Sequence, residues 1–125
     1  MGVREKIIDQ NKFDLYEVDV SEWGDIGEPL YVNTLSCQEA EAFELSCRSD
    51  DGQPQDFKAH IVSVALVTGE RERVFADGDI HIVRNLNARV INRVADLALK
   101  VNGYTDSDLE ELGKNLNGTT SNGSG

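Results

Sequence analysis

The chain has 125 residues, a formal net charge of −11 at pH 7, and 39% hydrophobic residues. That length suffices for one domain with a modest core and is too short for two independent ones. No apolar run approaches the roughly 18 residues of a membrane helix, so we expect no membrane contact. Charged residues come too early in M-G-V-R-E-K-I-I-D-Q for a secretory signal, so we expect the protein in the cytoplasm.

The acidic residues are concentrated in the N-terminal half. Residues 1–56 contain 14 Asp and Glu against 4 Lys and Arg, whereas residues 57–103 contain 5 against 7. An acidic surface of this size repels phosphate backbones, which excludes nucleic acid as the expected partner. It favours solubility, or binding to a basic protein.

The first predicted feature is a β-hairpin. Residues 1–12 are polar and should be frayed, with Ile7 and Ile8 able to tether them to the body. Residues 13–20 alternate in polarity as a strand does, and residues 30–35 form a second strand after a turn that contains two glycines and a proline. The pair predicts an antiparallel hairpin.

Residues 36–48 predict a helix. Ser36 is followed three residues later by Glu39, the spacing of a capping box. Cys37 and Cys47 both fall in this helix, so a disulfide between them would require the helix to break. We therefore expect two reduced, buried thiols.

A third helix should follow a loop at residues 50–55, with Asp56 as its cap. Its apolar stripe ends before Gly69 and consists of Phe57, Ile61, Val64, Ala65 and Leu66. Residues 70–75 have two interpretations. They form either a short edge strand or an extended connection that brings Val74 and Phe75 into the core.

A short helix then leads into the helix that forms the predicted centre of the core. Residues 78–86 predict a short helix with Ile80, Val83 and Leu86 facing inward. Residues 87–103 predict an amphipathic helix, capped by Asn87 and ended by Gly103. Its apolar stripe consists of Val90, Ile91, Val94, Leu97, Ala98 and Val101.

The C-terminal residues divide into a capped acidic turn and a polar tail. Thr105 and Asp108 have the spacing of a cap pair. Residues 113–125 have nothing to bury and should be a disordered tail. The predicted fold class is therefore α+β, with an N-terminal two-stranded antiparallel hairpin followed by a mainly helical body, in a single domain over residues 1–112.

Residues that could carry chemistry are scarce. The two histidines, His60 and His81, fall in separate helices without a nucleophile motif. Two acidic pairs, Asp77 with Asp79 and Asp106 with Asp108, lack the alternating ligands and closing glutamate of a calcium loop. The sequence contains no zinc-site spacing, phosphate loop or dinucleotide fingerprint. We expect a protein that is not an enzyme and needs no cofactor or metal.

Trp23, the single tryptophan, lies in the predicted turn between the strands. It either folds over the end of the hairpin or is exposed as an anchor for a protein partner. With Phe43 and Phe75 it forms the set of candidate partner-binding residues.

The order of elements resembles the tail assembly chaperones of long-tailed bacteriophages over roughly residues 13–116. The similar features are Trp23 and Gly24 after the first strand, a strand that ends in T-L-S, an acidic helix, and a helix of the type A-H-I-V-S-V-A-L-V. A polar segment G-E-R-E-R-V-F-A-D-G-D and a helix that ends in L-K-V-N-G-Y-T follow. In residues 70–79 the chain resembles the family's stretch in which charged residues lead to Val and Phe and then to an acidic helix start.

The resemblance implies a small non-catalytic protein that binds the tape measure protein and keeps it soluble during tail assembly. It implies action in the host cytoplasm and absence from the mature virion. Self-association into a homo-oligomer is left open. Two other interpretations also remain open: a structural tail component, such as a terminator or connector subunit, and a small bacterial adaptor protein.

Overall fold

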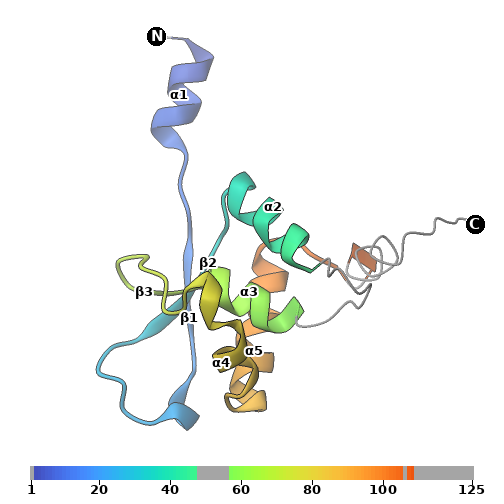
Figure 1. Ribbon diagram of the computed structural model, residues 1–125. Helices are drawn as coiled ribbons and strands as arrows, with labels where there is room; N and C mark the ends of the chain where they lie inside the picture. The colour runs from blue at the N-terminus through green and yellow to red at the C-terminus, as the bar shows by residue number, and fades with distance from the viewer. Residues whose placement is uncertain (1, 48–56, 106, 109–125) are drawn as a thin grey trace, which may run out of the picture.

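The computed structural model describes residues 2–47, 57–105 and 107–108 of an α+β fold. Figure 1 shows a small sheet with the helices that follow residue 36 gathered on one side of it. The strands and helices of these residues are α1 (Val3–Gln10), β1 (Leu15–Val18), η1 (Ser21–Trp23), β2 (Leu30–Asn33), α2 (Cys37–Ser46), α3 (Phe57–Ala65), β3 (Leu66–Thr68), η2 (Asp77–Asp79), α4 (Ile80–Arg84) and α5 (Ala88–Val101).

The three strands form one antiparallel sheet in the order β1-β2-β3. Val18 on β1 and Thr68 on β3 both lie opposite Leu30 of β2. The predicted hairpin of β1 and β2 is confirmed, with shorter strands than predicted. The prediction of a two-stranded sheet was incomplete, because β3 adds a strand from within the helical body.

Helix α5 lies at the centre of the core, packed against α3 and against strands β1 and β2. Val90, Val94 and Ala98 are fully buried on it. The buried stripe is rotated from the predicted one: Ala95 and Leu99 are buried, whereas Leu97 and Val101 are only partly buried. The predicted ends are confirmed, since the Asn87 side chain accepts a hydrogen bond from Arg89 N and Gly103 has a φ of 82°.

The capping box of α2 is present as predicted. Ser36 N donates to Glu39 Oε1 at 2.8 Å, and Glu39 N donates to Ser36 Oγ at 3.1 Å. Both cysteines are free thiols; Cys47 is buried as predicted, but Cys37 is exposed. Cys37 occupies the first turn of α2, where its side chain faces solvent instead of the core.

The third predicted helix ends earlier than its apolar pattern indicated. Leu66 was predicted on the helical stripe, but α3 ends at Ala65 and Leu66 begins β3. Leu66 and Val67 are fully buried, one opposite Val32 and the other opposite Tyr31 of β2. A continuous apolar run has no period that separates a buried helix from a buried strand, which explains the error.

Residues 69–75 form a tight turn and an extended connection that pairs with β3 at one bridge only, so the predicted edge strand is reduced to that bridge. Arg71 has a positive φ of 64°, and a single isolated bridge joins Val67 to Arg73. Phe75 packs against the core as expected, but Val74 is 37% exposed. The short helix predicted after this connection is divided into η2 and α4.

The N-terminal residues were predicted as frayed, but residues 3–10 form helix α1. Figure 1 shows α1 standing away from the body. Ile7 and Ile8 are 63% and 60% exposed, so they do not tether this segment to the core. Its sequence V-R-E-K-I-I-D-Q contains no glycine or proline, so nothing in it interrupts a helix.

Several predictions fall outside the described residues: the loop at residues 50–55, the Asp56 cap, the domain boundary at residue 112 and the tail at residues 113–125. The Thr105–Asp108 cap pair is present, with hydrogen bonds of 2.8 and 3.1 Å in the two directions. Within the part of the chain that the structure describes, every helix is too short or too polar to cross a membrane.

Candidate partner-binding groove

The connection between β1 and β2 is shaped by its own polar residues. Asp19 Oδ1 accepts a hydrogen bond from Ser21 N, and Asp25 Oδ1 accepts one from Gly27 N, each at 2.9 Å. Such Asx turns fold the backbone locally. Gly27 has a φ of 88°, a conformation that other residues rarely adopt. The sequence therefore sets the local path of this loop, which carries Trp23.

Arg93 of α5 fixes the loop relative to the helical body. Its Nη1 donates to the Asp19 carbonyl at 2.6 Å and to Glu22 Oε1 at 2.9 Å, and its Nη2 donates to Glu22 Oε2 at 2.7 Å. The hydrogen bonds from Arg93 are the main reason that the pKa of Glu22 is lowered to about 2. Glu22 is therefore ionised in the folded protein at neutral pH. Its pairing with Arg93 holds the adjacent Trp23 at one end of the sheet.

Trp23 and Phe75, two of the three predicted partner-binding residues, line the same groove, which has a volume of about 460 Å³. The groove lies where the β1–β2 loop, the end of β3 and the connection before η2 meet the end of α4. Its lining residues are Trp23, Ile26, Glu28, Leu30, Thr68, Val74, Phe75 and Leu86. Two aromatic and four aliphatic side chains make this surface mainly apolar.

Two aliphatic side chains in this groove face solvent. Ile26 is 43% exposed and Val74 is 37% exposed. The indole Nε1 of Trp23 is buried and finds no hydrogen-bond acceptor among the described residues. An exposed apolar surface of this kind is a candidate contact site for a partner, because leaving it in water costs free energy.

The third predicted site residue, Phe43, lies elsewhere. It is 2% exposed on α2, and its ring meets that of Tyr104 edge to face, with centroids 5.3 Å apart. Tyr104 Oη donates to Glu44 Oε2 at 2.7 Å, and burial together with this bond raises the pKa of Tyr104. Phe43 thus packs in the core and takes no part in the groove.

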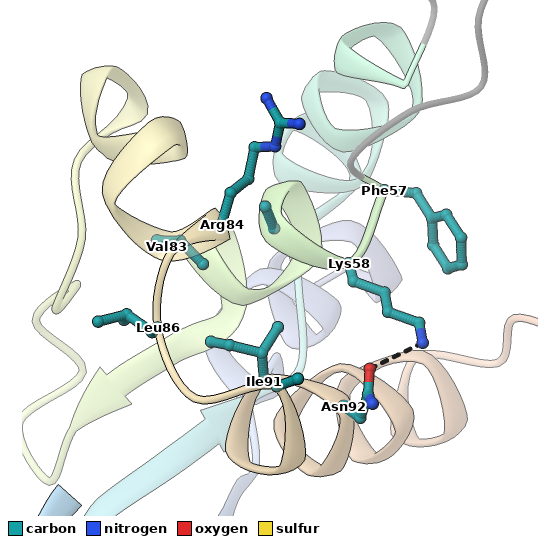
Figure 2. Close-up of a pocket in the computed structure, with 9 residues that line it drawn as sticks. Phe57, Lys58, Val83, Arg84, Leu86, Ile91 and Asn92 are labelled. Atoms are coloured by element: carbon teal, nitrogen blue, oxygen red, sulfur yellow. Dashed lines mark hydrogen bonds between the residues drawn. The ribbon is translucent and has the colours of Figure 1, made fainter.

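A second cavity of about 310 Å³ lies between α3, α4 and α5 (Figure 2). Figure 2 shows Lys58 extending from α3 toward Asn92, whose Oδ1 accepts its hydrogen bond at 2.8 Å. Leu86 lines both this cavity and the groove. The second cavity is smaller and has a more polar edge, so the groove is the better candidate for an apolar partner.

The described residues contain no group of three or more His, Cys, Asp or Glu side chains arranged to hold a metal ion. His81 is exposed on α4, whereas His60 is partly buried on α3. The groove itself contains one titratable side chain, Glu28. The arrangement is suited to apolar binding.

No protein-family model and no curated protein sequence matches this chain. Among solved structures, the chain is similar to the bacteriophage HK97 tail assembly chaperone, with a TM-score of 0.55 and 17% sequence identity. The similarity covers 79% of this chain and 97% of the HK97 protein. The chain has a tail-assembly-chaperone-like fold.

The likeness to the HK97 chaperone agrees with the fold implied by the sequence resemblance. The groove residues were only partly foreseen, because Ile26, Val74 and Leu86 were not predicted as site residues. Ile26 could have been found, since it is the one aliphatic residue in the loop S-E-W-G-D-I-G-E-P. An isolated aliphatic side chain in a polar turn has no local packing partner, which is a signal for a contact outside that turn.

Proposed function

We propose that this protein is a non-catalytic phage tail assembly chaperone that binds the tape measure protein and keeps it soluble during tail assembly. The observation that carries the proposal is the fold likeness to the HK97 tail assembly chaperone. The apolar groove lined by Trp23 and Phe75 supplies the contact surface.

The physical requirements of such a chaperone agree with this surface. A long helical client exposes apolar stripes before assembly, and a helix with an apolar stripe binds in an apolar groove. The complex must still stay in solution. A net charge of −11 provides mutual repulsion between complexes and opposes their aggregation.

The test is co-expression with the tape measure protein encoded by the same phage. We expect the client to remain soluble and to copurify with the chain. The double variant Ile26→Ser with Val74→Ser should lose this activity, because it removes exposed apolar contact from the groove without adding charge. Ile82→Ser with Leu45→Ser is the matched control, since Ile82 and Leu45 are 45% and 62% exposed away from the groove.

The outcomes separate the site from the function. A client that stays soluble with the groove variant would show that another surface binds it. A client that is insoluble even with the natural chain would overturn the chaperone proposal and favour the structural tail component.

The proposal places the protein in the host cytoplasm and outside the finished particle. Mass spectrometry of purified virions should therefore detect no stoichiometric copy of the chain. One observation favours a second candidate, a structural tail component: β1 is an edge strand of the sheet, and an unpaired edge can pair with a neighbouring subunit. Stoichiometric copies in purified particles would favour this candidate, such as a terminator or connector subunit.

A further inference from the structure

We infer that the segment bound in the groove is an amphipathic helix with Lys or Arg beside its apolar stripe. This inference rests on the proposed function and names the class of client segment that the groove selects. The inference follows from the charged residues around the groove, whereas the proposed function uses the apolar residues that line it.

Glu28 lines the groove, and three further carboxylates lie on the two neighbouring turns that flank it. Leu30 pairs with Thr68, so the turn before β2 and the turn after β3 lie at the same end of the sheet. The first turn carries Asp25 and Glu28, and the second carries Glu70 and Glu72. We call these four residues the acidic rim. All four are exposed, and none forms an ion pair with another described residue.

The cationic side chains of the second turn are directed to other partners. Arg71 stacks on the ring of Phe13, with its Cζ 4.4 Å from the ring centroid, and its Nε donates to Asn33 Oδ1 at 3.2 Å. Arg73 donates to the Ser63 carbonyl at 2.8 Å and to Asp77 at 2.9 Å. Neither arginine is paired with a carboxylate of the acidic rim, which stays net negative beside the apolar surface even when the charge of Arg71 is counted.

An apolar floor with an acidic rim is complementary to a cationic amphipathic helix. The apolar stripe would cover Ile26 and Val74, and flanking lysines or arginines would pair with Glu28 and Glu72. Since these pairs are exposed, each adds little affinity, but an acidic helix would meet repulsion from the whole rim. The rim thus selects among apolar helices of similar hydrophobicity.

Two synthetic peptides test this selection with the full chain. Both are helical, free of tryptophan, about 18 residues long and carry the same leucine stripe; one has lysines beside the stripe and the other has glutamates at the same positions. Trp23 is the single tryptophan of the chain and lines the groove, so its fluorescence reports binding there. We expect the lysine peptide to bind about tenfold more tightly at low salt, as two or three exposed ion pairs allow. The preference should shrink in high salt.

Rim variants then assign the preference to these residues. Glu28→Lys with Glu72→Lys should reverse it. Glu41→Lys with Asp96→Lys makes the same change in net charge on exposed positions outside the groove and should leave the order of the peptides unchanged. Equal binding of the two peptides, tighter binding of the glutamate peptide, or an equal effect of both double variants would overturn the inference.

The proposed function is tested separately by the full-length client. If the tape measure protein copurifies but rim reversal has no effect, the chaperone function stands and the inference fails. If neither the client nor either peptide binds, the proposed function fails as well. One more outcome would overturn the inference. In it, light scattering detects self-association, the association changes Trp23 fluorescence, and Ile7→Asp abolishes it. The groove would then be occupied by α1 of a second copy.

Discussion

The carboxylate of Glu22 accepts hydrogen bonds from both terminal nitrogens of Arg93, although the two residues are 71 positions apart. The side chains are 30% and 37% exposed, so the pair lies at the surface and closes the loop against α5. Two parallel hydrogen bonds between a guanidinium and a carboxylate fix the relative orientation of the two side chains as well as attracting them. It links the residue beside Trp23 to the helix at the centre of the core.

This pair predicts an acid-sensitive contribution to stability. The pKa of Glu22 falls from 4.5 to about 2 on folding, so its contribution is complete above pH 4.5 and is lost as the pH falls through about 2. Glu22→Gln should therefore be less stable than the natural chain at neutral pH, and the difference should vanish near pH 2. Urea unfolding at several pH values measures this difference. A difference that does not depend on pH would contradict the ion pair.

Replacing Arg93 by lysine should loosen the loop. A lysine cannot donate in parallel to both Glu22 oxygens and also reach the Asp19 carbonyl. We expect a red shift and easier quenching of Trp23 fluorescence in Arg93→Lys, with helix content unchanged by circular dichroism. Arg89→Lys, on the same helix but outside this contact, is the control. Unchanged quenching would show that the loop is fixed by other contacts.

Asn102 joins the end of α5 to the segment between β2 and α2. Its Oδ1 accepts from Leu35 N at 2.7 Å, while its Nδ2 donates to the Ala98 carbonyl at 2.9 Å and to the Asn33 carbonyl at 3.3 Å. Asn102→Ala should cost about 1–3 kcal/mol, because it leaves a partly buried Leu35 N–H without an acceptor. Asn102→Asp keeps that acceptor but presents a carboxylate oxygen, in place of the donating amide, to the Ala98 and Asn33 carbonyls, so it should also be less stable than the natural chain. Denaturant midpoints measure both variants, and an unchanged midpoint for Asn102→Ala would argue against this explanation.

The central position of Val94 predicts a packing cost. Val94 is 0% exposed on α5, so Val94→Ala should destabilise the fold by about 1–3 kcal/mol through lost burial and a cavity. Ile82→Ala removes a larger side chain, but one that is 45% exposed, and should change stability by less. Thermal unfolding of both variants gives the comparison. Equal melting temperatures for Val94→Ala and the natural chain would mean that the stripe is not in the core.

The two thiols should differ in reactivity. Cys37 is exposed, whereas burial raises the pKa of Cys47 to about 12, which suppresses its reactive thiolate. A thiol reagent such as Ellman's reagent should modify one cysteine quickly in the folded protein and the second only after unfolding. Cys37→Ser should abolish the fast phase. Two fast phases in the native chain would contradict the burial of Cys47.

Local features of this fold could be predicted well from neighbouring residues. Ser36 and Glu39 cap α2, Asn87 caps α5, and Gly103 follows its end, as their spacing predicts. Each of these features depends on hydrogen bonds and backbone angles within a few positions. The alternation before β2 likewise predicted an antiparallel hairpin, since a short connection allows few other pairings.

The third strand could not be predicted in the same way. Leu66 and Val67 are equally compatible with a buried helix or a buried strand, and the choice depends on the hydrogen-bonding groups that β2 presents to them. The apolar stripe of α5 likewise could be predicted only in part. Which of Leu97 and Leu99 is buried depends on the rotation of the helix against α3 and the sheet, and the helical period alone does not set that rotation.

The caps, the hairpin, the amphipathic character of α5 and the excess of negative charge follow from residue type and short spacing, so they could be predicted from the sequence. That Trp23 and Phe75 share a groove with Leu86, that Phe43 does not, and that Glu22 meets Arg93 could be seen only in the fold. Contacts between distant segments depend on how whole elements pack. A side chain's neighbours across the core are set by the sum of many apolar contacts rather than by any pattern within its own segment.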